Sequence, residues 1–323
     1  MSRSEPRSPP TRGWGRGATL ALGLGLAVAL AGFGCRPSPP PPRAAAASVE
    51  PVYDFPREYR RHATLPCAEG SGLIYLAATG HELLSYAPEE NAIRAVGTMS
   101  CPPSRRGRRR FASSEHSMAV DRSGVAWVVH QDGALYRVDT RDASCAESDY
   151  DASRGDFLRF GSAFVATGSD LRSETYFVAA SPRETFDGAE SGGLGRIVGG
   201  TKLERIGEFS EPLRGLDAEL TGTGDGRLFG FFATRPATLA EIDPKTARIL
   251  SARRLPGVVT GRAWAFAFWG GAFYFFWEPL GARSSNVSRL NEAGEIEHLL
   301  RDVGYEIVGA GVSTCAPTLG SKP

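Results

Sequence analysis

The chain has 323 residues, of which 41% are hydrophobic and 10% aromatic, a composition that suits one large folded domain or two small ones. Its 39 Gly and 22 Pro residues, with few long helical patterns of apolar residues, favour an all-β architecture. A formal net charge of +1 does not favour a nucleic-acid partner.

The first 34 residues predict a secretory signal peptide. Four arginines precede an apolar stretch that runs from Ala18 to Phe33 and ends at Gly34. This order of positive, apolar and small residues is typical of a signal for export. The apolar stretch is shorter than the roughly 20 residues that a membrane-spanning helix needs.

Cys35 gives this signal a more specific interpretation. A cysteine directly after the small-residue end of such a stretch resembles the cleavage box of lipoproteins, in which the thiol is acylated before cleavage. The box departs from the usual pattern, because Gly32 stands where a Leu is common and Phe33 is bulky. The alternative is an ordinary secreted protein that is cleaved nearby. An acylated Cys35 would hold the mature chain at a membrane surface of the cell envelope, either the outer membrane or a periplasm-facing surface.

A tether and one folded domain are expected after the signal. Residues 35–60 are rich in Pro and Ala, a composition that cannot bury a core, and residues 61–323 carry a repeated β pattern. Removal of residues 1–34 lowers the formal net charge from +1 to −2, which again gives no reason to expect a nucleic-acid partner.

A short strand pattern repeats along this domain. Each copy has Leu or Val early and a β-branched or aromatic residue later, and the five copies are Glu82–Tyr86, Ala134–Asp139, Gly193–Val198, Thr238–Asp243 and Asn286–Asn291. The early Leu or Val residues are separated by 52, 59, 45 and 48 residues. This spacing suits the four-stranded blades of a β-propeller better than any helical repeat.

A hairpin precedes each repeated strand, and an outer strand follows most of them. The most apolar hairpin is Trp264–Trp277, in which two alternating strands meet at Gly270 and Gly271. Glycine-rich turns suit such tight antiparallel reversals. Because one face of the Trp264–Trp277 hairpin is wholly aromatic, a carbohydrate-stacking platform is an alternative to core packing between blades.

The two ends of the repeated region predict a closed ring. The first copy has no innermost strand before Gly72–Leu76, whereas Val308–Thr314 resembles the innermost strands and no further strand follows it. We therefore expect the C-terminal strand to complete the first blade, which removes the free edges that an open array would expose. The predicted fold is an all-β propeller of five four-stranded blades.

The four cysteines beyond Cys35 are expected to form two disulfides in an oxidising compartment. On the ring model Cys67 precedes the first blade and Cys315 ends the closing strand, while Cys101 and Cys145 follow the outer strands of neighbouring blades. Cys67–Cys315 and Cys101–Cys145 are the natural pairs, although four cysteines permit three pairings and the sequence does not choose among them. The cysteines lack CxxC spacing and the histidines are scattered, which gives a zinc site weak support.

The repeats resemble those of known propellers. The pattern Ala-Val-Asp-x-x-Gly-x-x-Trp-Val at residues 119–128 is similar to repeats of NHL- and SMP-30-like propellers. With the Thr-Cys-Ala-Pro ending, residues 67–317 resemble uncharacterised bacterial lipoproteins that carry a propeller domain. The resemblance implies a fold and an envelope location. It implies no catalytic residues, because a metal-ligand set of the gluconolactonase kind has no match in this chain.

The candidate binding residues lie on loops that lead into the innermost strands, because propellers usually bind ligands at the mouth of the central channel. In this sequence those positions are occupied by Glu115, His116, Phe160, Asp217, Glu219, Arg262 and Glu306. A ring of carboxylates with one His and one Arg suits a cation, a sugar or the end of a peptide. The alternative is that these residues belong to a solvated loop surface.

The sequence favours a binding or scaffolding module over an enzyme. It contains no GxSxG, HExxH, Walker or dinucleotide fingerprint, and no cofactor is predicted. The expected ligand is a protein, a peptide or a glycan, in addition to the membrane that an acylated Cys35 would bind. The rival hypothesis is a metal-dependent lactonase or hydrolase that acts at the channel mouth.

Overall fold

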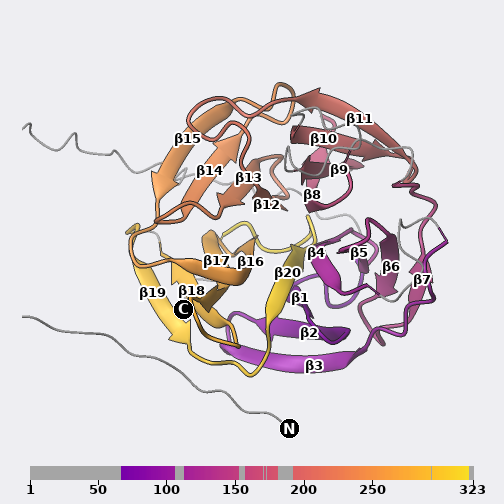
Figure 1. Ribbon diagram of the computed structural model, residues 1–323, viewed down its shortest axis with the longest axis horizontal. Helices are drawn as coiled ribbons and strands as arrows, with labels where there is room; N and C mark the ends of the chain where they lie inside the picture. Colours follow the sequence, from indigo (N-terminus) through magenta and orange to yellow (C-terminus); the bar gives the residue numbers. More distant parts are fainter. Residues whose placement is uncertain are drawn as a thin grey trace, which may run out of the picture. The chain divides into compact units, whose positions relative to one another are not determined.

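The structure, a computed structural model, describes residues 67–105, 113–152, 157–169, 171, 173–180, 192–291 and 293–319. The expected signal peptide, Cys35 and the tether of residues 35–60 lie outside the described residues, as do residues 61–66 of the expected propeller domain. Within the described ranges, the strands form five four-stranded antiparallel sheets that surround a common centre as blades (Figure 1). This arrangement confirms the predicted five-bladed β-propeller. No helix in the described part of the chain is long and apolar enough to cross a membrane.

Each blade runs from an innermost strand to an outer strand. Blade 1 contains β20 (Ile307–Val312), β1 (Ile74–Ala78), β2 (Glu82–Ala87) and β3 (Ala92–Thr98). Blade 2 contains β4 (Glu115–Val120), β5 (Val125–His130), β6 (Leu135–Asp139) and β7 (Cys145–Glu147). Blade 3 contains β8 (Phe160–Thr167), β9 (Ser173–Ala180), β10 (Gly193–Val198) and β11 (Lys202–Gly207). Blade 4 contains β12 (Ala218–Gly222), β13 (Leu228–Phe232), β14 (Thr238–Ile242) and β15 (Ile249–Arg254). Blade 5 contains β16 (Thr260–Trp269), β17 (Ala272–Pro279), β18 (Asn286–Leu290) and β19 (Ile296–Leu300).

The repeated strand pattern of the sequence marks the third strand of every blade. These strands are β2, β6, β10, β14 and β18. The predicted hairpin precedes the third strand in blades 2 to 5, whereas β1 alone precedes β2 in blade 1. The outer strands face water on one side, so their burial is incomplete, as in β3 and β11. The irregularity that the sequence shows in the second copy corresponds to a short outer strand, β7.

Neighbouring blades cover both faces of each sheet, and this explains the alternation of small and large residues in β16. Ala265 and Ala267 pack in one cluster with residues of blade 1. Phe266 and Phe268 point the other way and pack in a second cluster with Phe229 of blade 4. Both phenylalanines of β16 are at most 3% exposed, and burial of each contributes about 1.5–3 kcal/mol. The aromatic hairpin therefore belongs to the core and does not form a carbohydrate platform.

The C-terminal strand closes the ring as predicted. β20 pairs with β1 in antiparallel register, with Val312 opposite Ile74 and Ala310 opposite Leu76. In Figure 1 the yellow strand β20 lies between the inner strands of blade 5 and the rest of blade 1. The first blade is thus completed by the last strand of the chain.

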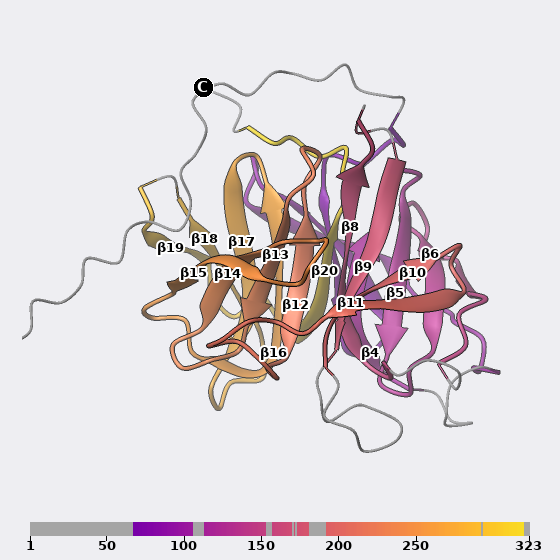
Figure 2. The ribbon, with the colours of Figure 1, turned by 90° about the horizontal axis from the view of Figure 1, so that it is seen from above.

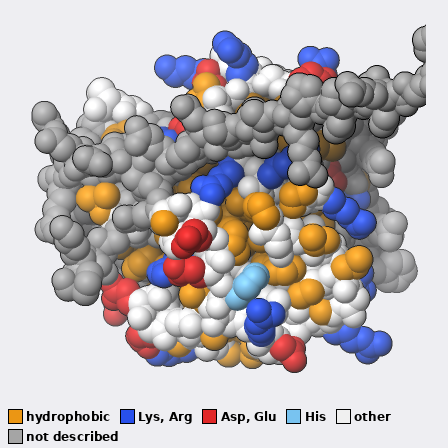
Figure 3. All heavy atoms as spheres, turned by 90° about the vertical axis from the view of Figure 1, so that its left-hand side faces the viewer, with side chains coloured by type: hydrophobic (Ala, Val, Ile, Leu, Met, Phe, Trp, Pro, Cys, Tyr) orange, Lys and Arg blue, Asp and Glu red, His pale blue; other side chains and the backbone are white. Residues whose placement is uncertain are grey.

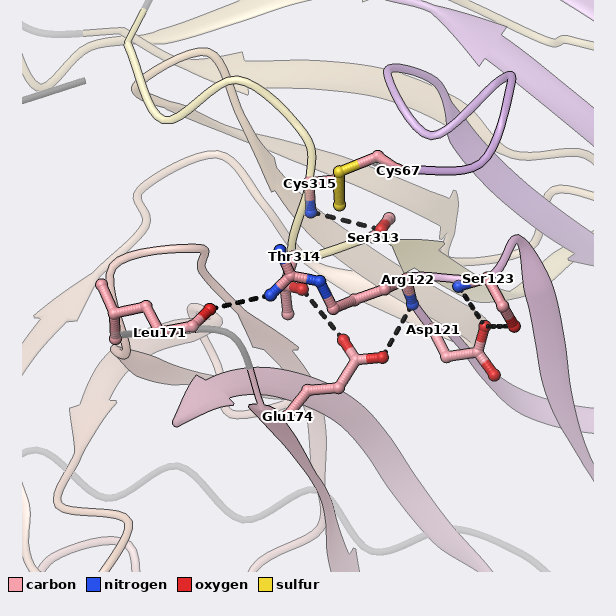
Figure 4. Close-up of a disulfide and its surroundings, with 9 residues drawn as sticks. All are labelled: Cys67, Asp121, Arg122, Ser123, Leu171, Glu174, Ser313, Thr314 and Cys315. Carbon is pink, nitrogen blue, oxygen red and sulfur yellow. Dashed lines mark hydrogen bonds between the residues drawn. A yellow bond between two sulfur atoms is a disulfide. The ribbon is translucent and has the colours of Figure 1, made fainter. Parts of the chain in front are cut away.

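Two disulfides connect Cys67 with Cys315 and Cys101 with Cys145, which confirms both natural pairs. The first disulfide fastens the end of the closing strand (Figure 4). Beside it, the Glu174 carboxylate accepts hydrogen bonds from the Arg122 backbone N–H at 2.7 Å and from the Thr314 hydroxyl at 2.9 Å. Burial raises the pKa of Glu174, although these two hydrogen bonds act in the opposite direction. This carboxylate therefore joins blade 3 to the turn that follows β4 and to the segment that follows β20.

We expect loss of the Cys67–Cys315 disulfide to destabilise the protein more than loss of the Cys101–Cys145 disulfide. Their sequence separations are 248 and 44 residues. The chain-entropy model therefore assigns about 5.5 and about 4 kcal/mol, respectively, to the free energy of unfolding. Urea denaturation of the Cys67→Ser, Cys315→Ser variant and of the Cys101→Ser, Cys145→Ser variant would measure both losses. An equal or larger loss in the second variant would contradict the expectation.

Candidate functional site

The innermost strands β4, β8, β12, β16 and β20 stand side by side around the centre of the ring (Figures 1 and 2), and all five begin at the same end. We call this end the mouth face. It also carries the turns between the second and third strands, because the Thr79 N–H in the β1–β2 turn donates to the Glu306 carbonyl next to the start of β20, at 2.9 Å. The opposite end of the ring carries the Cys67–Cys315 disulfide.

The inner strands approach one another closely beneath the mouth face. A Cβ atom on Gly161 of β8 would lie only 2.1 Å from the Ala218 carbonyl oxygen of β12, so no side chain larger than hydrogen fits between these strands at this point. The Ser117 hydroxyl of β4 donates to the Glu219 carboxyl of β12 at 2.7 Å, and both side chains are buried. We therefore expect a ligand to contact the loops of the mouth face and not to enter the ring.

Glu115 lies buried at the junction of blades 1 and 2. Its side chain is 0% exposed, and its Oε1 atom lies 2.6 Å from His81 Nδ1 and 3.9 Å from His130 Nε2. Among the described residues, Glu115 Oε2 and His130 Nε2 have no hydrogen-bond partner. Burial lowers the pKa of His130, against the raising effects of Glu115 and Asp132. Burial thus favours the neutral His130 ring, and this junction offers unpartnered buried polar atoms to a hydrogen-bond donor.

His116 faces away from this group, although it follows Glu115 in the sequence. Its Nδ1 atom lies 3.4 Å from Gln131 Nε2, and the Arg159 guanidinium donates to Gln131 Oε1 at 2.6 Å. Burial, together with the positive charge of Arg159, lowers the pKa of His116 to about 4. His116 is therefore a neutral polar contact at neutral pH and does not supply a cation to the mouth face.

Asp217 and Glu219 stand in different environments at the start of β12. Asp217 is exposed on the mouth face, whereas Glu219 is buried beneath it. Burial raises the pKa of Glu219 well above its usual value, and the nearby Asp217 raises it further, while the hydrogen bond from Ser117 opposes both. Glu219 therefore ties inner strands together. Phe160 is also buried, at 1% exposure, within the core between blades 2 and 3.

Arg262 and Glu306 meet at the junction of blades 5 and 1, together with Glu278 of β17. Arg262 is 72% exposed, with its Nε 3.8 Å from Glu278 Oε1 and a terminal guanidinium nitrogen 3.5 Å from Glu306 Oε1. The Glu278 side chain is only 2% exposed. In the part of the chain that the structure describes, its Oε2 atom has no hydrogen-bond partner.

The sequence analysis did not identify His81, His130 or Glu278. These residues lie in the β1–β2 turn and at the ends of β5 and β17. Antiparallel pairing brings them to the mouth face, because Glu115 pairs with His130 and Thr260 pairs with Pro279. The available signal was the hairpin itself, since the end of each second strand must lie beside the start of the first strand.

The described residues contain no group of three or more His, Cys, Asp and Glu side chains arranged for a metal ion. Glu115, His81 and His130 have a suitable composition. However, the direct contact of 2.6 Å between His81 Nδ1 and Glu115 Oε1 leaves no space for an ion between those two atoms.

A concave feature lies on the side of the propeller between blades 4 and 5. It is a hollow of about 290 Å³ whose lining includes Arg253, Leu255, Leu290 and Ile296. Figure 3 shows this side of the molecule, where hydrophobic side chains are interspersed with charged ones. The Arg253 guanidinium donates to the Gly294 carbonyl, and no residue of the lining has a buried side-chain polar atom that lacks a partner among the described residues. The mouth face is therefore the better candidate for a site.

Comparisons with known proteins give structural likenesses at low identity. No family model matches the sequence, and no curated protein matches it. A chain in a crystal structure of a nidogen/laminin complex is similar to this chain with a TM-score of 0.44 and 10% identity, over 74% of this chain and 97% of that chain. A protein of unknown function from Bacteroides caccae gives a TM-score of 0.41 and 10% identity over the same shares of the two chains.

Glu219→Gln is expected to change how stability depends on pH. The amide keeps the size of the carboxyl group and can accept the hydrogen bond from Ser117. Because the pKa of Glu219 is higher in the folded chain than in the unfolded chain, the stability from its protonated form is complete below about pH 4.5 and is lost as the pH rises through the folded-state pKa. The variant lacks this loss. The free energy of unfolding of the variant, relative to that of the wild type, should therefore increase by about 1.4 kcal/mol per pH unit between pH 4.5 and the folded-state pKa of Glu219.

Urea denaturation between pH 4.5 and pH 8 would measure this difference. Glu90→Gln is the matched control, because this carboxylate is exposed and does not contribute to the pKa shift of Glu219. A difference between Glu219→Gln and wild type that stays constant with pH would show that burial does not raise the pKa of Glu219.

Proposed function

We propose that this protein is a lipid-anchored binding module of the cell envelope whose ligand contacts the mouth face of the propeller. The observation that carries the proposal is the pair of buried carboxylates Glu115 and Glu278, each with one oxygen atom that has no partner among the described residues. A buried polar group left without a partner costs about 1–3 kcal/mol. A ligand that donates hydrogen bonds would recover this free energy on binding.

The location of the proposed module rests on the export signal and on the cysteines. The sequence around Cys35 resembles a lipoprotein cleavage box, and two disulfides suit an oxidising compartment. The resemblance of the repeats to NHL- and SMP-30-like propellers implies a fold and an envelope location and brings no catalytic residues with it.

Acylation of Cys35 can be tested by metabolic labelling with an alkynyl fatty acid. We expect the wild-type protein to carry the label and to fractionate with membranes, because the acyl chains supply the anchor. Cys35→Ala should lose the label, whereas the Cys101→Ser, Cys145→Ser variant should keep it and serve as the cysteine control. A labelled Cys35→Ala variant, or a wild-type protein found in the cytosol, would contradict the anchoring proposal.

Binding at the mouth face can be tested by photo-crosslinking on whole cells. A benzophenone amino acid would replace Asp217 on the mouth face or Ser123 at the opposite end, both of which are exposed positions. We expect crosslinked products from position 217 that position 123 does not give. Glu115→Gln and Glu278→Gln should reduce their yield several-fold, because each replaces an acceptor oxygen by a donor. Identical products from both positions would argue against a ligand at the mouth face.

A further inference from the structure

We propose that the mouth face binds a segment of a partner protein in which a lysine lies beside apolar side chains, an inference that rests on the proposed function. The surface comprises Leu216, Val259, Leu280, Glu278 and Glu306, and we call it the mouth patch. It combines exposed apolar side chains with an incompletely satisfied pair of carboxylates.

The apolar part of the mouth patch lies on blades 4 and 5. Leu216, Val259 and Leu280 are 36%, 38% and 67% exposed, and they are three of the six exposed large hydrophobic side chains in the described chain. Val259 and Leu280 are neighbours across the β16–β17 hairpin, because Thr260 pairs with Pro279. Leu216 precedes β12, the innermost strand of the adjacent blade. Apolar exposure is therefore concentrated where the chain enters two neighbouring innermost strands, as is typical of an interaction surface.

The acidic part of the mouth patch lies directly beside it. Leu280 follows Glu278 by two residues, and Glu306 leads into β20 of the adjacent blade. Arg262 approaches these two carboxylates only to 3.8 and 3.5 Å, whereas charge-assisted hydrogen bonds are about 2.7–2.9 Å long. Glu278 Oε2 also has no hydrogen-bond partner within the described ranges, although its side chain is 98% buried. The two carboxylates thus keep acceptor capacity that Arg262 does not use.

A lysine ammonium fits this acceptor better than a guanidinium does. The ammonium is a compact charge on a flexible stem, whereas the planar fork of arginine is suited to two parallel acceptor atoms. Glu278 offers one unpartnered oxygen, Oε2, in a buried position. Apolar residues beside the lysine would cover Leu216, Val259 and Leu280, so that one ligand satisfies both parts of the mouth patch.

Formal charge argues for a different partner protein and against a second copy of this chain. Among the described residues, Arg262 is the one cation within 4 Å of Glu278 and Glu306, so this pair of carboxylates keeps a formal excess of one negative charge. A symmetric dimer through the mouth patch would place the same acidic surface on itself, and like charges that face one another are unfavourable. A basic segment has the complementary charge.

Selection from a random dodecapeptide phage library on the immobilised propeller would test this inference. The library is first depleted on the Glu278→Gln, Leu280→Ser double variant, whose fold is checked by its melting temperature. We expect the selected peptides to be enriched in lysine flanked by Leu, Ile or Phe. Absence of enrichment, or enriched peptides without lysine, would overturn the inference.

The synthesised consensus peptide would then be titrated by fluorescence anisotropy. Glu278→Gln and Leu280→Ser should each raise its Kd at least tenfold, and replacement of its lysine by norleucine should do the same. Glu204→Gln on β11 and Leu250→Ser on β15 are matched controls on outer strands, where Leu250 is 57% exposed, and they should change the Kd less than twofold. Equal effects of the controls would overturn the inference.

Two further outcomes separate this inference from the proposed function. Sedimentation equilibrium should show a monomer, and a dimer that Leu280→Ser dissociates would overturn the inference in favour of a second copy of this chain. Crosslinks at position 217 without lysine-containing peptides would overturn the inference and leave the proposed function standing. Failure of both the crosslinks and the selection would overturn both.

Discussion

The pairing of β20 with β1 is the constraint on which the rest of the propeller depends. Without β20, blade 1 would lack its innermost strand and β1 would expose an unpaired edge. The same strand brings Glu306 beside Arg262 of blade 5 and beside the β1–β2 turn. The Cys67–Cys315 disulfide and the hydrogen bond between Thr314 and Glu174 hold the opposite end of this closure. The geometry of the mouth face is therefore a consequence of ring closure.

The fold could be predicted because a pattern of apolar residues, as long as one strand, repeats along the sequence. In a propeller both faces of a blade are covered by its neighbours, so the strand pattern recurs at blade spacing even where individual residues differ. The alternation in β16 follows directly, because Ala265 faces blade 1 and Phe266 faces blade 4. The unpaired first copy and the surplus last strand predicted the closure. The start of β8 was not predicted, because the sequence analysis placed Phe160 on a loop, whereas β8 begins at this residue.

The site could be predicted only in part, because the sequence analysis considered only the loops that lead into the innermost strands. That criterion found Arg262 and Glu306, which meet at the junction of blades 5 and 1. It missed Glu278, whose place follows from strand register. The sequence analysis also could not predict how deeply the side chains of the candidate residues are buried. Glu115 and His116 are adjacent in sequence, yet a bulge between Glu115 and Ser117 shifts the register of β4, and the two side chains find different partners.

Glu219 and Glu278, two buried glutamates of the mouth face, differ in whether their hydrogen bonds are satisfied within the protein. Glu219 accepts a hydrogen bond from Ser117, and its burial favours the protonated form, which needs no cation. Glu278 is equally enclosed, but one of its oxygens has no partner among the described residues and its nearest cation, Arg262, is mostly in solvent. A carboxyl group of the first kind stabilises the ring by itself. A carboxylate of the second kind weakens the protein until a hydrogen-bond donor reaches it, and this unmet acceptor is the basis on which we propose a ligand for the mouth face.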